Sequence, residues 1–332
     1  MHSPQTWQPT EAFRPRWGIG NGHFQTIASH LLPRAVALPA PEERLIEVAP
    51  GIRVRCDCHW QTDRRTALTV IAVHGLEGSS DSQYMRGIAQ KALALGMNVA
   101  RMNQRNCGGT EALAPTLYHS GLSGDVGAVA QTLVASEKLT RIALVGYSMG
   151  GNLVLKLAGE WGASHPELQA VAAVCPALDL AASADALHEP ANRLYEMHFV
   201  RRLKQRLALK AQLFPAQFNI AAANGASSVR EFDNQVTAPF SGFRDADDYY
   251  ARAAAANVVG HIAVPTLVVH AADDPFVRIQ PTTLAKIAAN PNVRYAETAH
   301  GGHCAFLAAP NGYDGYWAER QIVDFLQSSL AE

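Results

Sequence analysis

Ser148 lies at the centre of Gly146-Tyr-Ser-Met-Gly150, which matches the G-x-S-x-G pattern of a nucleophile elbow. An apolar run, Arg141–Val145, predicts a short buried strand before Ser148, and Asn152–Trp161 predicts a helix after it. Gly146 and Gly150 suit the tight turn because side chains there would clash with the strand or the helix. A serine hydroxyl lifted above a sheet edge in this way can attack a carbonyl carbon, provided that a base and an acid assist it.

Two later loops offer those partners in the chain order serine, acid, histidine. Asp273 and Asp274 follow the apolar run Thr266–His270, and we prefer Asp274 as the acid because Pro-Phe-Val comes directly after it. We expect Asp273 to cap the following turn. A glycine pair, Gly301-Gly302, allows the last loop to bend so that His303 reaches Ser148 as the base, whereas His300 is expected at a strand end or in solvent.

The sequence also suggests where an oxyanion would bind. His74-Gly75-Leu76 ends an earlier buried strand, and the backbone N–H groups of Leu76 and Met149 are the expected donors. They would act by position, not through their side chains. We expect His74 to hold this loop by a hydrogen bond, not to act as a base.

These residues require a particular scaffold. Strand and helix patterns alternate along residues 67–175, which predicts an α/β fold with a mostly parallel, doubly wound sheet. An antiparallel hairpin is expected at its edge, over Arg44–Val48 and Arg53–Trp60. Further strands are expected at Val171–Cys175, Thr266–His270 and Val293–Thr298, and further helices at Ser82–Leu95, Asp125–Ser136, Pro281–Ala289 and Tyr316–Leu326.

Residues 181–253 interrupt this alternation with helical patterns and no clear strand, which predicts a helical cap insertion over the strand ends. Within it Glu196–Phe214 predicts a helix with an apolar face and a basic face. The basic face would consist of Arg201, Arg202, Lys204, Arg206 and Lys210. Such a helix either rests on an anionic membrane, or covers the active site with its apolar face and exposes its basic face to water. We favour the second interpretation. Glu231–Tyr250 is either an anchor that lines the entrance or a plain surface connection.

Composition sets further bounds. With 332 residues, 48% of them hydrophobic, and a net charge of -1, the chain can bury a large core and shows no nucleic-acid-binding surface. Five cysteines without repeated spacing indicate reduced thiols. We expect residues 1–332 to form one domain, with residues 1–40 as an ordered arm. Without a signal peptide or an apolar run of about 18 residues, a cytoplasmic location is expected.

Taken together, these motifs resemble those of the YheT-like branch of the α/β-hydrolases, which is related to the embryogenesis-associated and ABHD-type proteins. The segments that carry the resemblance are Asn21–Ile27, His74–Ser79, Asn103–Thr110, Leu117–Gly121, Gly146–Asn152, Glu231–Pro239 and Gly301–Cys304. The resemblance implies a serine carboxylesterase or lipase-type activity with Ser148, Asp274 and His303 as the triad.

The residues and the resemblance together predict cleavage of carboxylic esters, either apolar acyl esters or lipids, through a covalent acyl-enzyme. No metal or organic cofactor is needed for this chemistry. The alternatives are a thioesterase, an amidase or a phospholipase on the same triad, or a binding protein that kept the fold without catalysis. The oligomeric state and the acyl-chain length do not follow from the sequence.

Overall fold

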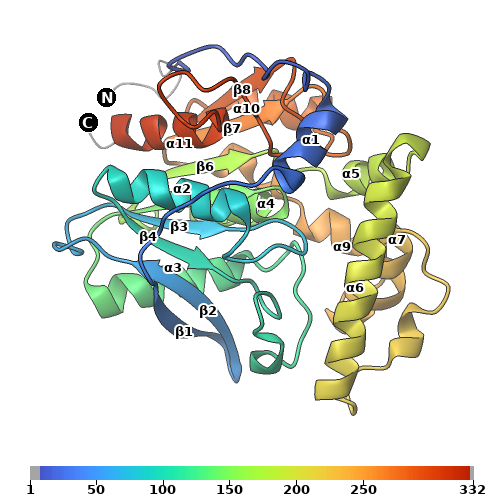
Figure 1. The fold of residues 1–332 in the computed structure, drawn as a ribbon. Coiled ribbons are helices and arrows are strands. Elements are labelled where there is room, and N and C mark those ends of the chain that lie inside the picture. The colour runs from blue at the N-terminus through green and yellow to red at the C-terminus, as the bar shows by residue number, and fades with distance from the viewer. Residues whose placement is uncertain (1–7, 330–332) are drawn as a thin grey trace.

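A computed structural model describes residues 8–329 and shows one eight-stranded sheet flanked by helices (Figure 1). The strand order is β1-β2-β4-β3-β5-β6-β7-β8. The first two strands form an antiparallel hairpin, β2 runs antiparallel to β4, and every other pairing is parallel. The predicted sheet, with its antiparallel hairpin at one edge, is therefore confirmed. The strands are β1 (Glu42–Ala49), β2 (Ile52–His59), β3 (Thr69–Val73), β4 (Asn98–Met102), β5 (Ile142–Tyr147), β6 (Leu168–Val174), β7 (Thr266–Ala271) and β8 (Val293–Thr298).

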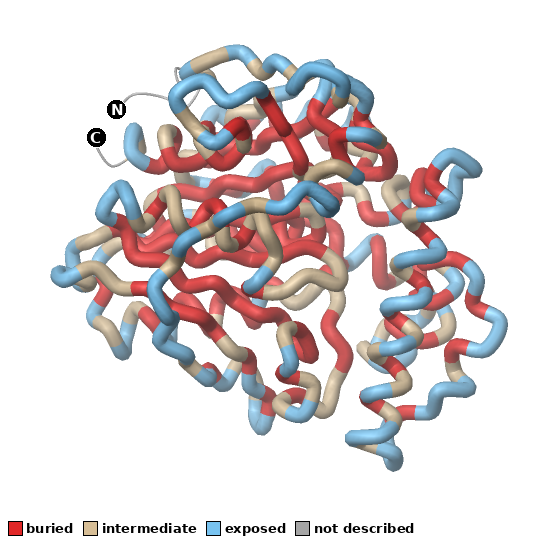
Figure 2. The backbone as a smooth tube through the Cα atoms, viewed as in Figure 1, coloured by how far each residue is buried: buried red, intermediate tan, exposed pale blue. Residues whose placement is uncertain are grey.

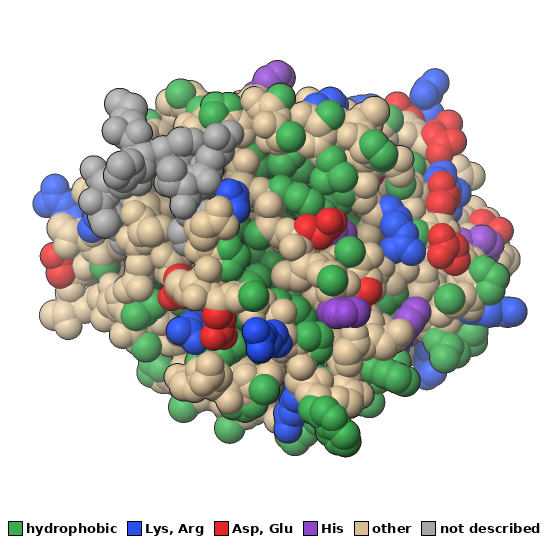
Figure 3. Space-filling view, turned by 90° about the horizontal axis from the view of Figure 1, so that it is seen from above, with side chains coloured by type: hydrophobic (Ala, Val, Ile, Leu, Met, Phe, Trp, Pro, Cys, Tyr) green, Lys and Arg blue, Asp and Glu red, His purple; other side chains and the backbone are tan. Residues whose placement is uncertain are grey.

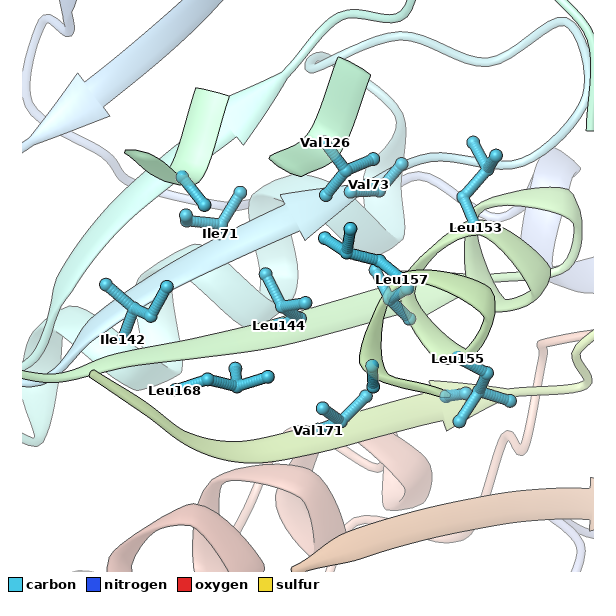
Figure 4. Close-up of a cluster of buried hydrophobic side chains, with 14 of the residues drawn as sticks. Ile71, Val73, Val126, Ile142, Leu144, Leu153, Leu155, Leu157, Leu168 and Val171 are labelled. Carbon is cyan, nitrogen blue, oxygen red and sulfur yellow. The ribbon is translucent and has the colours of Figure 1, made fainter. Parts of the chain in front are cut away.

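Helices cover both faces of the sheet. One face packs against α3 (Ser123–Glu137), α4 (Met149–Trp161) and α10 (Pro281–Ala289), and Figure 4 shows part of the apolar cluster between these layers. The other face packs against α2 (Gln83–Ala94) and α11 (Trp317–Ser328). Figure 2 shows that the central strands are buried along their length. Strands buried on both faces carry continuous apolar runs, which is why the sequence located them well.

The helices between β6 and β7 form a layer of their own beside the carboxyl edge of the sheet (Figure 1). We call residues 180–261 the insertion. Its longer helices are α5 (Leu180–Leu187), α6 (Arg193–Leu213) and α9 (Ala246–Ala253), and the short α7 (Val229–Phe232), a π-helical turn (Asp233–Thr237) and α8 (Ala238–Phe240) lie between α6 and α9. Its apolar cluster also takes in Phe276 and Val277, from the loop after β7. The insertion is thus packed against a loop that carries predicted catalytic residues.

The structure corrects the prediction for α6. Val200, Leu203 and Leu207 are buried as expected, but the opposite face is not simply solvated. Lys210 is fully buried, and Arg206 has only 11% of its side chain exposed. Both point at the main domain, because they form hydrogen bonds to the Asn106 loop. The mixed charge pattern did not reveal this, since a buried cation needs partners that lie far away in the sequence.

A helix that the sequence did not predict lies in the N-terminal arm. Helix α1 (Gly22–Leu31) begins where the Asn21 side chain accepts a hydrogen bond from the His23 N–H at 2.9 Å. Its buried positions are Gly22, Gln25 and Thr26, so the sequence lacks the apolar stripe that would predict a helix here. In the described part of the arm, Gln25 of this helix forms hydrogen bonds with the backbone of Leu307, and residues 1–7 of the predicted arm lie outside the described residues.

Across residues 8–329, no helix combines the length and the apolar character needed to cross a bilayer.

Candidate active site

Ser148 occupies a strained turn between β5 and α4. Its backbone angles, φ 54° and ψ −119°, lie where side-chain-bearing residues rarely occur. A Cβ on Gly146 would come within 2.3 Å of the Gly150 carbonyl oxygen, and one on Gly150 within 2.3 Å of the Val73 carbonyl oxygen. Both glycines are therefore required by close packing, as the pattern indicated. The turn leaves Ser148 partly exposed at the carboxyl edge of the sheet.

Asp274 and His303 meet on neighbouring loops of that edge. The His303 Nδ1 and the Asp274 Oδ2 lie 2.8 Å apart, and the other carboxylate oxygen accepts hydrogen bonds from the N–H groups of Phe276 and Val277. Only 1% of the Asp274 side chain is exposed. The aspartate thus holds both its own loop and the imidazole.

Several contacts bring this pair close to the serine. The Val174 carbonyl oxygen accepts the Ser148 N–H at 2.9 Å and the thiol of Cys304, the residue after His303, at 3.4 Å. No hydrogen bond joins Ser148 to His303 within the described residues. The His303 Nε2 instead lies 3.9 Å from the Cys304 Sγ. Catalytic hydrogen bonds are often long or poorly aligned before substrate binds, so a serine–histidine pair does not depend on such a bond being formed here.

The turn-capping role expected of Asp273 belongs to its neighbour. Asp274, not Asp273, accepts the hydrogen bonds of the following turn. Asp273 instead accepts the Gly302 N–H at 2.9 Å and lies 3.2 Å from the His300 Nδ1. It therefore fixes the histidine loop, and the prediction that it caps its own turn is wrong. His300 is exposed at the end of β8, as predicted.

Opposing effects act on the two ionisable groups. Burial would raise the pKa of Asp274, but the charge of His303 and its hydrogen bond lower it below the usual carboxyl value. Burial would lower the pKa of His303, but the Asp274 carboxylate, with a smaller contribution from Cys304, raises it well above the usual imidazole value. An ionised aspartate that stabilises an imidazolium is the electrostatic arrangement that a general base requires.

The loop after β3 lies against the serine. A Cβ on Gly75 would stand 3.0 Å from the Ser148 Cβ. Leu76 and Met149 line the same pocket as Ser148, and no hydrogen bond from either backbone N–H is formed within the described residues. His74 is fully buried, with its Nδ1 2.8 Å from the Gly75 carbonyl oxygen and its Nε2 accepting the Gln104 N–H, so it forms hydrogen bonds of the kind expected of a residue that holds this loop.

Sequence reasoning missed the residue that anchors this loop. Glu77 has a positive φ of 57°, and its carboxylate forms two 2.9 Å hydrogen bonds with Arg206 of α6. The Tyr118 hydroxyl donates to the same carboxylate at 2.7 Å. Burial would raise the pKa of Glu77, but Arg206 lowers it, so the pair is ionic. The residue next to Leu76 is therefore tied to the insertion.

Sequence reasoning also missed the part that the arm plays. The His303 N–H donates to the Thr26 Oγ1 at 2.8 Å, and the Thr26 hydroxyl donates to the Gly22 carbonyl. A Cβ on Gly22 would come within 1.9 Å of the Asp273 carbonyl oxygen. Helix α1 therefore packs directly on both loops. Asn21–Ile27 is one of the segments that carried the resemblance, so a signal existed, but it did not point to this contact.

A mostly apolar pocket opens beside Ser148. The main domain contributes Leu76, Tyr118 and Met149 to its wall. The insertion contributes the larger share, which includes Leu180, Ala184, Leu187, Phe199, Leu203, Val229, Tyr249 and Tyr250. Asp233 and Thr237 are its polar members from the predicted entrance segment, which is therefore more than a surface connection. A more polar hollow behind Asp274 is not lined by Ser148.

A family model described as the alpha/beta hydrolase fold matches residues 69–310. The chain belongs to the α/β-hydrolase family. A protein named "Putative esterase YheT" from Escherichia coli is 32% identical over 327 residues, covering 96% of this chain and 94% of the relative. A mouse protein named "Phospholipase ABHD3" is 28% identical, covering 97% and 79%. The resemblance inferred from the motifs is therefore confirmed.

Solved structures agree on the fold of this α/β-hydrolase. The Pyrococcus furiosus esterase Pf2001 has a TM-score of 0.56 and 18% identity, covering 89% of this chain and 98% of its own. Est1E from Butyrivibrio proteoclasticus also has a TM-score of 0.56, with 16% identity and coverage of 87% and 99%. At these identities the likeness concerns the fold alone.

Proposed function

We propose that this α/β-hydrolase cleaves carboxylic esters with apolar acyl groups, using Ser148 as nucleophile, His303 as base and Asp274 as its orienting acid. The observation that carries the proposal is the 2.8 Å contact between Asp274 and His303 on the loops beside the strained Ser148 turn. The names of the relatives, an esterase and a phospholipase, support the same reaction class.

The proposed reaction has two steps. The His303 Nε2 takes the Ser148 proton as Oγ attacks the ester carbonyl, and the oxyanion is held by the N–H groups of Leu76 and Met149. The imidazolium, stabilised by Asp274, gives its proton to the leaving alcohol. Water, activated in turn by His303, then attacks the acyl-enzyme and releases the acid. Apart from the substrate and this water, the residues of the chain supply every group that the two reaction steps need.

The pocket supports the substrate class. Its wall beside Ser148 consists mainly of aliphatic and aromatic side chains, so an acyl chain would gain about 0.8 kcal/mol for each methylene buried there. The insertion supplies most of that wall and would therefore act as the cap that selects the acyl group.

A phospholipid or other lipid ester is the second candidate. The relatives named phospholipase favour it, and so do exposed apolar side chains on α1 and at the start of α6. Phe24, Leu31, Leu194 and Met197 are 60%, 76%, 80% and 57% exposed. These residues suit lipid contact better than the basic face of α6 does, because Arg206 and Lys210 form hydrogen bonds inside the protein and are not available to a membrane. Charges of both signs are interspersed on the face in Figure 3, without a continuous basic surface.

The direct test replaces the nucleophile. Ser148→Ala should abolish hydrolysis of p-nitrophenyl acyl esters and labelling by a fluorophosphonate probe, while the circular dichroism spectrum stays unchanged. A chain-length series on the parent enzyme, with phospholipid and thioester substrates alongside, separates the substrate candidates. Unchanged turnover by the alanine variant would refute the assignment of Ser148 as the nucleophile of the triad. Absence of labelling in the parent would favour a non-catalytic binding protein.

A further inference from the structure

Two thiols with no part in the proposed reaction lie beside its base. Cys175 directly follows β6, and Cys304 directly follows His303. The Cys304 N–H donates to the Cys175 Sγ at 3.4 Å, and the Cys304 Sγ lies 3.9 Å from the His303 Nε2. One ligand atom from each of the three residues lies within 4.8 Å of the other two. Both thiols are free.

Two thiolates and an imidazole form a known type of metal-binding set. Zn²⁺ takes four ligands in a tetrahedron, with Zn–S distances of about 2.3 Å and Zn–N distances of about 2.0 Å, and three protein ligands leave one position open. Neighbouring ligand atoms in such a tetrahedron are roughly 3.3–3.8 Å apart. The atoms here are separated by at most 4.8 Å, so shifts of about 1 Å would close the site.

The surroundings also suit a metal. Asp274 already holds the Nδ1 of His303 at 2.8 Å, which is the carboxylate–histidine arrangement that orients metal-binding imidazoles. A second imidazole, that of His270, has a ring nitrogen within 4.8 Å of both the Cys175 Sγ and an Asp274 oxygen. His270 is 5% exposed, and its buried Nδ1 has no hydrogen-bond partner in the described part of the chain.

We propose that a soft divalent cation of the Zn²⁺ type binds Cys175, Cys304 and His303 and reversibly inhibits the enzyme. The two thiols, and the Nε2 of a protonated His303, release their protons to solvent, and both sulfurs and the His303 Nε2 then donate electron pairs to the ion. Nothing is oxidised or reduced. Because Nε2 is the atom that would take the Ser148 proton, the metal-bound enzyme lacks its base. Inhibition rests on the proposed function, whereas metal binding does not.

Binding is tested on the full chain with Co²⁺ as a spectroscopic probe. The parent should bind one ion and develop the near-ultraviolet sulfur-to-cobalt charge-transfer absorption of a thiolate complex, which Zn²⁺ then displaces. Cys304→Ser, which keeps the side-chain size but replaces the sulfur, and Cys175→Ala each remove a ligand and should weaken binding by at least the roughly 10–100-fold that loss of an outer-shell partner costs. Cys56→Ala, at a buried cysteine in β2, is the matched control and should bind like the parent. No charge-transfer absorption in the parent would overturn the proposal.

Inhibition is tested separately with ester hydrolysis. Zn²⁺ should inhibit the parent and Cys56→Ala, a chelator should restore the rate, and Mg²⁺, which prefers oxygen ligands, should have no effect. The cysteine variants, each compared with its own metal-free rate, should resist Zn²⁺. Equal inhibition of all variants would refute the site. A chain that shows the cobalt absorption but no hydrolysis would refute the proposed function and support the metal site.

Discussion

Adjacent aspartates allow the acid of the triad to be identified by a matched pair of variants. Asp274→Asn keeps the size of the side chain and an oxygen for the N–H groups of Phe276 and Val277, which Asp274 Oδ1 now accepts at 3.1 and 2.9 Å. The new amide would then face the His303 Nδ1, 2.8 Å from the present Oδ2. An amide N–H donates, so it favours the tautomer that carries its proton on Nε2, and that nitrogen can no longer accept the serine proton.

The expected loss follows from this change of tautomer. The same substitution in a serine protease triad lowers kcat by about 10⁴-fold, which corresponds to about 5 kcal/mol of transition-state stabilisation. Asp273→Asn is the control, because its amide oxygen can still accept the Gly302 N–H now held at 2.9 Å. Replacing a charged acceptor by a neutral one weakens that hydrogen bond by about 1 kcal/mol. We therefore expect kcat of Asp273→Asn to fall by about fivefold.

The assay is kcat and KM on p-nitrophenyl esters, together with the rate of fluorophosphonate labelling and the thermal midpoint of both variants. A large loss of kcat in Asp274→Asn, with KM and the midpoint near the parent values, supports the assignment. Equal losses in the two variants, or a larger loss in Asp273→Asn, would refute it.

Three further predictions concern the oxyanion loop, the insertion and pH. Gly75→Ala should lower kcat by about 10²–10³-fold with little change in thermal midpoint, because its Cβ would stand 3.0 Å from the Ser148 Cβ and displace the oxyanion donors; an unchanged kcat would contradict this. Arg206→Met should destabilise the fold by about 3–5 kcal/mol in urea unfolding, because it leaves the Glu77 carboxylate, 5% exposed, unpaired; Glu77→Gln in the same chain should restore much of the loss, and no restoration would count against a direct pair. Burial raises the pKa of Asp233 from 3.8 to about 6, so the folded state favours the protonated acid and loses stability as pH rises between those values. Asp233→Asn should therefore gain up to about 3 kcal/mol over the parent between pH 4 and pH 8, and a constant difference across this range would refute the shift.

Local sequence patterns were enough to predict an element wherever its bounds depend on its own residues. The predicted bounds of α10 and β8 coincide with the observed ones, because Pro281 marks the helix start and the β-branched and aromatic residues Val293, Tyr295 and Thr298 favour a strand. The Ser148 turn was predictable for the same reason, since Gly146 and Gly150 report close packing in their own vicinity. The relation of Asp274 to His303 followed from topology, because the carboxyl ends of parallel strands share one edge.

Long-range polar contacts were beyond such patterns. Glu77 and Arg206 lie 129 positions apart, and each looks alone like an ordinary surface charge. Helix α1 buries Gln25 and Thr26, so its inner face lacks the apolar signal that marks most helices. Which of two adjacent aspartates caps the turn depends on how one loop bends, and the neighbouring positions differ too little in sequence to decide it.

These long-range contacts imply that the insertion does more than shape a pocket. Arg206 of α6 holds the residue next to Leu76, and Phe276 joins the insertion's apolar core while its ring lies 4.4 Å from that of His303. A shift of the insertion would therefore move an expected oxyanion donor and press on the base. Bound acyl chains that repack the insertion should change kcat as well as KM. Substrate selection and reactivity are, on this argument, properties of the same set of contacts and should vary together across a chain-length series.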